Sequence, residues 1–158
     1  MIRFETKRCL IRNFIEGDIE EFMDYRNDKN WMQYQGFTGL TREEYKEALL
    51  TEGSVDEGMQ LAIVCKSNSK LLGDLYLKKC GDVFWIGYTI SPLYARQGYA
   101  YETTLALLEW IKGQGISKVY AGVLPENRAS IQLLKKLGFT CIERDENEED
   151  IFLLEVES

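Results

Sequence analysis

The residues from Phe84 to Ala100 could bind a phosphate group, because they combine a strand, a tight turn and the start of a helix. The apolar run FWIGYTI ends two residues before Pro92, and Gly98 stands just ahead of a helical pattern. A helix that begins directly after a turn leaves its first N–H groups without partners, and the helix dipole adds partial positive charge there. Such a turn is suited to a phosphate or a pyrophosphate.

A second segment, PENRASIQLLKKLGF from Pro125 to Phe139, predicts another helix with polar residues near its start. Asn127 stands at the first turn, where its side chain could cap the helix or face a ligand. Ser130 follows three residues later on the same face. It could donate a proton or serve as a small residue in helix packing. For both residues the pattern leaves the structural and the chemical role open.

These two segments resemble signature regions of the GCN5-related N-acetyltransferases (GNAT). The residues ARQGYA are similar to the coenzyme-A loop of that family, and Pro125 to Phe139 is similar to its later helix. The segments ETKRCLIRNF and DYRNDKNWMQYQGF resemble the ribosomal-protein N-terminal acetyltransferase (RimJ/RimL-like) branch, so the resemblance covers nearly the whole chain. One departure is Ala95, where the family loop usually opens with Arg or Gln; here Arg96 and Gln97 follow it.

The resemblance implies acetyl-CoA as the acyl donor and co-substrate, with no metal. The pantetheine arm would lie beside the strand that ends at Ile90, where the backbone of Thr89 and Ile90 would pair with it and could polarise the thioester. A bulky side chain is disfavoured at Gly98, because backbone and phosphate must approach closely. The backbone N–H groups expected to hold the pyrophosphate are those of Arg96, Gln97, Gly98, Tyr99 and Ala100.

The resemblance also implies catalytic roles in the later helix. In the family, the residue at the position of Asn127 contacts coenzyme A or an active-site water. Ser130 matches a serine proposed as the proton donor in the ribosomal branch. The tyrosine that often acts as general acid in the family falls at Leu134 here, so water is the alternative donor. A thiol leaving group needs only modest proton donation, since its pKa resembles that of cysteine, about 8.5.

The sequence does not identify a general base. The chain contains no histidine, which excludes Ser-His and Cys-His nucleophile schemes and most zinc sites. Asp74 and Glu5 are candidates, although each is expected to be a solvated strand residue; a tyrosine or ordered water is the alternative. Deprotonating an α-amine at pH 7 costs about 1 kcal/mol, against about 4.6 kcal/mol for a lysine amine. The lack of an obvious base therefore slightly favours acceptors whose amine has a low pKa.

An aromatic cluster between the first two expected helices could line the pocket for the acceptor, as this region often does in relatives. It could equally form a lid that packs on the sheet. The residues of the cluster are Trp31, Tyr34, Gln35 and Phe37.

The composition is that of a soluble globular protein, with 45% hydrophobic and 28% charged residues in 158. We expect a single N-acetyltransferase domain spanning residues 1–158. The net charge of −7 disfavours nucleic acid and anionic membrane as partners and suits a cationic acceptor. The opening MIRF does not begin a signal peptide, and no apolar run approaches the ~20 residues of a membrane span. We therefore expect a cytoplasmic protein with free thiols, buried or partly buried, at its four cysteines.

The periodicity predicts a mixed α/β domain of three layers (α+β), with helices on both faces of one mostly antiparallel, GNAT-like sheet. A first strand is expected over 2–13, and a meander of three strands over 59–65, 71–77 and 83–90. Thr41 and Glu44 form a capping box ahead of the second helix. The central helix should end at Gly113 and Gly115, the last helix should bury Ser130, Leu133, Leu134 and Leu137, and two strands around an acidic loop should close the sheet.

The function predicted from these features is an acetyl-CoA-dependent N-acetyltransferase that acts on a primary amine, with direct attack in a ternary complex. The amine would belong to a protein N-terminus or to a small molecule. The alternative is a non-catalytic acyl-CoA-binding or sensing domain. The identity of the acceptor and the oligomeric state, monomer or homodimer, cannot be read from the sequence.

Overall fold

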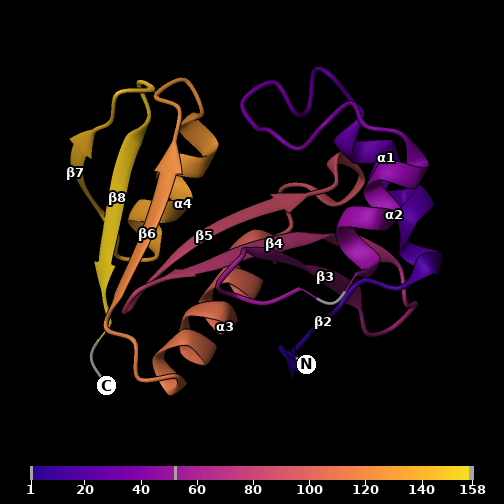
Figure 1. The fold of residues 1–158 in the computed structure, drawn as a ribbon, viewed down its shortest axis with the longest axis horizontal. Coiled ribbons are helices and arrows are strands. Elements are labelled where there is room, and N and C mark those ends of the chain that lie inside the picture. Colours follow the sequence, from indigo (N-terminus) through magenta and orange to yellow (C-terminus); the bar gives the residue numbers. More distant parts are fainter. Residues whose placement is uncertain (1, 52, 157–158) are drawn as a thin grey trace.

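A sheet of eight strands organises the described part of the chain, residues 2–51 and 53–156 of the computed structural model (Figure 1). The strands are β1 (Phe4–Glu5), β2 (Cys9–Arg12), β3 (Met59–Cys65), β4 (Leu71–Cys80), β5 (Val83–Ile90), β6 (Lys118–Val123), β7 (Thr140–Arg144) and β8 (Asp150–Glu155). The helices are α1 (Ile19–Arg26), α2 (Arg42–Leu50), α3 (Tyr99–Gly113) and α4 (Arg128–Lys136), with 3-10 turns η1 (Glu16–Asp18) and η2 (Pro92–Tyr94).

The strand order confirms the expected fold class. Across the sheet it is β1-β2-β3-β4-β5-β6-β8-β7. Every neighbouring pair is antiparallel except β5 and β6, which α3 connects as a crossover. The sheet is therefore mixed and mostly antiparallel, with its one parallel pair near the centre.

Helices cover both faces of the sheet, as alternate residues of β3 show. Leu61 and Ile63 belong to an apolar cluster that includes Leu107 of α3. Ala62, between them in the chain, belongs to a second cluster with Phe22 of α1. Side chains alternate between the faces of a strand, so α3 lies on one side and α1 and α2 lie on the other. The expected three layers are confirmed.

The parallel pair separates along its length, which opens the middle of the molecule. Only residues 83–85 of β5 pair with β6, opposite residues 118–120. Beyond Trp85 the two strands diverge, and Figure 1 shows their C-terminal ends pointing apart. One edge of β5, from Ile86 to Ile90, consequently has no partner strand among the described residues. Apart from the Ile90 carbonyl, which accepts a hydrogen bond from the Trp31 indole, its backbone groups could pair with an extended ligand.

Local signals in the sequence mark the helix ends correctly. Thr41 caps α2: its hydroxyl accepts from the N–H of Glu44, whose carboxylate accepts from the N–H of Thr41 in return. Gly138, just after α4, has φ of 98°, the left-handed conformation expected of a residue that ends a helix.

Two predicted elements differ from the structure. The single strand expected over 2–13 is broken into β1 and β2, which pair with each other around a turn at residues 6–8. In α4 only Leu134 is fully buried, whereas Ser130, Leu133 and Leu137 are half-buried. Ser130 and Leu133 line the opening between β5 and β6, where packing is incomplete, whereas Leu137 packs against the edge of the core.

The four cysteines are free, as expected, but their burial is uneven. Cys9 and Cys65 are buried, whereas Cys80 and Cys141 are exposed. The expectation that all four would be at least partly buried is therefore wrong for the last two. No helix in the described ranges is both long enough and apolar enough to cross a bilayer.

Candidate active site

Two adjoining hollows occupy the opening between β5 and β6. The larger, about 560 Å³, is bounded by the loop before α3 and the first turns of α3 and α4. The smaller, about 220 Å³, is bounded by β5, β6 and the loop before β8. The larger volume lies within the range of small-molecule pockets, about 300–1,000 Å³, and the smaller one lies below it. The hollows share five lining residues and so meet at these side chains: Tyr34, Gln35, Tyr88, Asn127 and Ser130.

The loop before α3, which bounds the larger hollow, contains backbone N–H groups without acceptors. Arg96 and Gly98 both have left-handed backbone, with φ of 63° and 83°, a conformation common in loops whose N–H groups converge on an anion. Within the described residues, the amides of residues 96–100 have no hydrogen-bond acceptor. Gly98 is the N-cap of α3 and offers no side-chain cap. The dipole of α3 is therefore directed at this loop.

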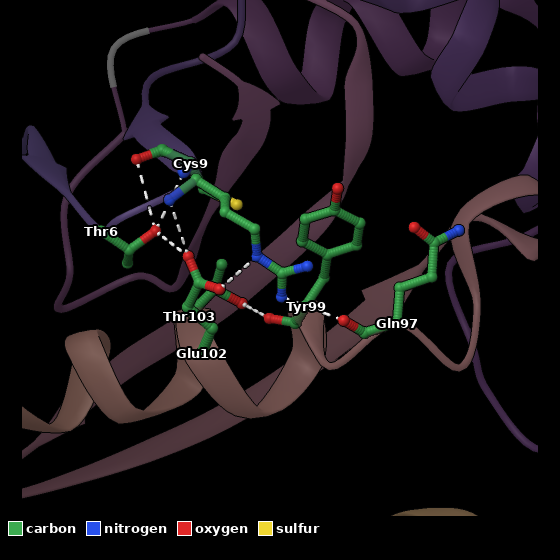
Figure 2. Close-up of polar contacts among 7 residues, drawn as sticks. Thr6, Cys9, Gln97, Tyr99, Glu102 and Thr103 are labelled. Atoms are coloured by element: carbon green, nitrogen blue, oxygen red, sulfur yellow. Dashed lines mark hydrogen bonds and ion pairs between the residues drawn. The ribbon is translucent and has the colours of Figure 1, made fainter. Parts of the chain in front are cut away.

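The five residues predicted for this loop do not all face the hollow. Arg96, Gly98, Tyr99 and Ala100 line it, but Gln97 does not. The carbonyl of Gln97 instead accepts a hydrogen bond of 3.0 Å from the guanidinium of Arg8. Figure 2 shows Gln97 and Tyr99 side by side at the start of α3.

A pair of hydroxyl groups stands where the two hollows meet. The hydroxyl of Tyr88 on β5 lies 2.7 Å from Oγ of Ser130 on α4 and 3.2 Å from the Ser130 carbonyl oxygen. Burial raises the pKa of Tyr88 to about 12, although its hydrogen bond with Ser130 lowers it. At neutral pH the phenol is protonated, so it can donate a hydrogen bond and cannot act as a base.

Asn127 caps α4 and keeps one side-chain donor group free. It is the N-cap of α4, and its Oδ1 accepts from the N–H of Ser130 at 3.3 Å. Among the described residues, its amide Nδ2 has no acceptor, and the side chain lines both hollows. The structural role of Asn127 is therefore present, and its donor group is free for a ligand.

Only some residues of the aromatic cluster predicted from the sequence line the hollows. Trp31 lines the larger hollow and donates its indole N–H to the carbonyl of Ile90 at 2.8 Å. Tyr34 lines both hollows. Phe37 lines neither, because its ring packs against Tyr45, with centroids 5.4 Å apart, inside the cluster beneath α1 and α2. Trp31 thus occupies the same edge of β5 that was predicted to pair with pantetheine.

A buried polar network fixes the last residues of β5. Asp74 forms an ion pair of 2.7 Å with Arg26. It also accepts a hydrogen bond of 2.5 Å from the hydroxyl of Tyr25. Arg26 also donates to Oγ1 of Thr89 at 3.2 Å, and that hydroxyl donates to Gln35 at 2.5 Å. Burial and the Asp74 carboxylate raise the pKa of Tyr25 well above its ordinary value. The network joins α1, β4 and the loop of residues 27–41 to the strand beside both hollows.

This network corrects the view of Asp74 as a solvated strand residue. Asp74 is only 1% exposed, and its oxygens are occupied by Tyr25, Arg26 and Gln60. A carboxylate held by a buried guanidinium is a structural anion and is poorly placed to act as a general base. Its charge is visible in the sequence, but its partner Arg26 is 48 residues away.

Two other carboxylates differ in their relation to the hollows. Glu5, the second candidate base, is exposed on β1, forms an ion pair of 3.8 Å with Lys66 and lines neither hollow. Glu149, which was not singled out in the sequence, lines the smaller hollow. Its Oε1 lies over the backbone of Gly122, 3.3 Å from the position that a Cβ would take. Glu149 therefore places a carboxylate at the wall of the smaller hollow.

Three residues near the site were not predicted from the sequence, and only one of them has a local sequence pattern that could have identified it. Tyr88 is two residues from both Ile86 and Ile90 in FWIGYTI, so the strand period could have placed it on the same face of the strand as these two residues. Glu149 is one of several acidic residues in its loop, and no local signal separates it from the others. Arg8 has no local signal either, because its partner Glu102 is 94 residues away.

Known proteins share both the sequence pattern and the fold. The family model described as "Acetyltransferase (GNAT) domain" matches residues 8–140. The chain is 31% identical to the uncharacterized N-acetyltransferase YnaD of Bacillus subtilis (strain 168) over 136 residues, which are 84% of this chain and 79% of that protein.

Two solved structures have the same fold at low identity. RimL, a ribosomal L7/L12 alpha-N-protein acetyltransferase in complex with coenzyme A, matches with a TM-score of 0.82 and 16% identity over 98% of each chain. Spermidine N-acetyltransferase from Vibrio cholerae, in complex with CoA and spermine, matches with a TM-score of 0.79 and 16% identity over 94% of this chain and 95% of that one. With the family model covering most of its length, the chain belongs to the GNAT acetyltransferases and is an acyltransferase of that family.

Proposed function

We propose that the protein is an acetyl-CoA-dependent N-acetyltransferase that transfers the acetyl group directly to a primary amine in a ternary complex. The observation that carries this proposal is the meeting of two hollows at Tyr88 and Ser130. A donor in the larger hollow and an acceptor in the smaller one would bring their reacting atoms together at that boundary. Such placement can supply much of the rate enhancement when the acyl group is already activated as a thioester.

The larger hollow suits coenzyme A. The unpaired amides of residues 96–100 and the N-terminus of α3 would hold the pyrophosphate. The pantetheine arm would extend along the free edge of β5 toward Tyr88. Trp31 would release the carbonyl of Ile90 when the arm pairs with that edge. RimL and spermidine N-acetyltransferase, which share this fold, were both solved with coenzyme A.

The proposed reaction needs no acyl-enzyme. The neutral amine nitrogen attacks the thioester carbonyl carbon, and the carbon–sulfur bond then breaks. The departing thiolate takes a proton from Ser130 as Ser130 takes one from Tyr88, through the hydrogen bond between their hydroxyl groups, and water returns a proton to Tyr88. The amine nitrogen loses its extra proton to water. The nucleophile is the substrate itself, so the cysteines and the absent histidine are not required.

The smaller hollow suits an amine that carries positive charge before it reacts. Among its described lining residues, Glu149 is the ionisable acid and no lysine or arginine is present. The net charge of −7 also favours the approach of a cation. We include protein N-termini and small-molecule amines in the acceptor class. RimL acts on a protein α-amine and the Vibrio cholerae enzyme on spermidine, so the shared fold does not choose between them.

Coenzyme release with a panel of amines tests the proposal. Free thiol is measured with acetyl-CoA and peptides, polyamines or amino acids, and amine-dependent release is expected for at least one class. Glu149→Gln should raise KM for that amine and leave the affinity for CoA unchanged. Glu146→Gln is the matched control, because it removes the same charge from an exposed position of the same loop. Binding of CoA without amine-dependent release would contradict the proposal and favour a sensing domain.

The cellular setting follows from the same proposal. A cytoplasmic enzyme that acts as a monomer or homodimer, with no nucleic acid or membrane as partner, would have access to acetyl-CoA and to free amines. Gel filtration with light scattering would give its oligomeric state.

A further inference from the structure

The turn between β1 and β2 contacts the loop before α3, although the two are far apart in the sequence. Arg8 stands in this turn, 89 residues before Gln97, and its Nη2 donates to the Gln97 carbonyl at 3.0 Å. The guanidinium also lies over the ring of Tyr99, 4.1 Å from the ring centroid. One side chain therefore contacts both Gln97, in the loop before α3, and Tyr99, which lines the larger hollow.

Glu102, in the first turn of α3, holds Arg8 in this position. Its Oε1 accepts from Nε of Arg8 at 2.7 Å, and its Oε2 accepts from the Arg8 backbone N–H at 2.9 Å. The hydroxyl of Thr6 donates to the same Oε2 at 2.6 Å and accepts from the N–H of Cys9 at 3.0 Å. Figure 2 shows Thr6 and Glu102 facing each other beside Tyr99. These hydrogen bonds connect the turn between β1 and β2 to the first turn of α3.

Hydrogen bonding keeps Glu102 ionised. Partial burial opposes the charge, but the bonds from Thr6 and from the backbone and side chain of Arg8 outweigh it and lower the pKa of Glu102. The hydrogen bond with Glu102 likewise raises the pKa of Arg8. The two charges therefore persist at neutral pH and neutralise each other, so that Arg8 adds little net charge to the loop.

The contact with Gln97 determines the direction of the next amide. The carbonyl of Gln97 and the N–H of Gly98 belong to one planar trans peptide unit, in which the two bonds point in opposite directions. Because the carbonyl is directed at Arg8, the N–H of Gly98 is directed away from Arg8. Gly98 lines the larger hollow, and a Cβ added to it would meet Nη2 of Arg8 at 3.5 Å. Arg8 thus lies behind the loop and the hollow lies in front of it.

We propose that Arg8 is a positioning residue for the coenzyme: held by Glu102 and Tyr99, it fixes the Gln97–Gly98 peptide so that the Gly98 N–H meets the pyrophosphate. This inference rests on the proposed function, because it assigns the larger hollow to coenzyme A. It adds a residue outside the loop motif, and it gives Glu102 and Thr6 the task of holding that residue. Arg8 acts through the loop backbone and touches no reacting atom.

The geometry requires an arginine. Its guanidinium donates to Glu102 through Nε and to the Gln97 carbonyl through Nη2 at the same time, and its flat face stacks on the ring of Tyr99. A lysine has one compact charge and no planar fork, so it cannot make these contacts together. Arg8→Lys should therefore behave like Arg8→Ala in coenzyme affinity, although it keeps the charge.

Two acetyl donors separate a positioning role from a general structural one. Acetyl-CoA carries the pyrophosphate, whereas S-acetylpantetheine has the same thioester arm without it. Arg8→Ala and Arg8→Lys should raise Kd for CoA and KM for acetyl-CoA by about ten- to a hundredfold, with kcat changed less. With S-acetylpantetheine, kcat/KM should match the wild type. Glu102→Gln should weaken CoA binding in the same direction.

Arg12→Ala is the matched control, because Arg12 forms a similar ion pair with Asp18, at 2.7 Å, away from the loop. It should leave Kd for CoA unchanged. Thermal unfolding is measured for every variant, and Arg8→Lys is used if Arg8→Ala does not fold. Equal losses with both donors, or no loss with either, would overturn the positioning role. Wild-type protein that binds no CoA would instead overturn the proposed function itself.

Discussion

The hydroxyl of Tyr88 and Oγ of Ser130 lie 2.7 Å apart at the boundary between the two hollows. Tyr88 comes from β5 and Ser130 from α4, so the pair bridges the strands and the helix that surround the site. The pKa of Tyr88 is raised to about 12, chiefly by burial. The Tyr88 phenol is therefore protonated at neutral pH, and in the proposed reaction the two hydroxyl groups are the source of the proton for the departing thiolate.

Ser130→Ala should lower kcat by about ten- to a hundredfold and leave Kd for CoA nearly unchanged, because a proton donor acts only as the thiolate leaves. Tyr88→Phe should lower kcat in the same direction. The double variant should lose about as much as the more severe single one, since the two groups act as a unit. Steady-state kinetics with saturating amine measure these effects.

Tyr120→Phe is the control for the loss of a phenol, because Tyr120 lines neither hollow and its ring stacks on Trp85. It should leave kcat unchanged. An unchanged kcat in Ser130→Ala would return that serine to its role in helix packing and leave proton donation to water.

Asn127→Ala should weaken CoA binding and also destabilise α4, because loss of an N-cap costs about 0.5–2 kcal/mol. Asn127→Ser separates the two effects. Serine caps a helix as well as asparagine does, but it lacks the amide donor that is free in the structure. We expect Asn127→Ser to keep the unfolding temperature and to raise Kd for CoA. Unaltered affinity in this variant would limit Asn127 to capping.

Gly98→Trp should abolish CoA binding while the circular dichroism stays nearly unchanged. The new side chain would crowd the loop, strain a residue with φ of 83° and displace Arg8, whose Nη2 lies 3.5 Å from the Cβ position. Gly81→Trp is the control for strain: its φ is 65°, nothing lies within 4 Å of its Cβ position, and it lines neither hollow. Calorimetric affinity retained in Gly98→Trp would remove this loop from the coenzyme site.

Asp74→Ala should lower the free energy of unfolding by about 3–5 kcal/mol, because it leaves the buried charge of Arg26 without its partner. Asp82→Ala, at an exposed turn, should change that free energy by less than about 0.5 kcal/mol. Denaturant titration measures both. If Asp74→Asn were as stable as the wild type and yet inactive, Asp74 would be a general base after all.

Short-range patterns in the sequence predicted the fold and part of the site. Thr41 and Glu44 lie three residues apart, and their capping box is fixed by local geometry. Gly98 and Asn127 mark helix starts for the same reason, and both line the larger hollow. Such signals depend on a few neighbouring residues, so a single sequence carries them in full.

The remainder depends on contacts between distant parts of the chain. The break between β1 and β2 is stabilised by Glu102, and the burial of Asp74 depends on Arg26. The pattern FWIGYTI predicts a strand but does not show that its pairing with β6 stops at Trp85. The opening that holds the site arises from that early end of the pairing, which no local pattern records.

Mass spectrometry of the intact protein tests direct transfer most immediately. The protein is incubated with acetyl-CoA alone, measured, and then mixed with a reactive amine. We predict an unmodified protein mass at both stages, with acetylated amine and free CoA appearing only after the amine is added. An acetyl group that forms on the protein with acetyl-CoA alone, and passes to the amine at the rate of turnover, would contradict the direct mechanism.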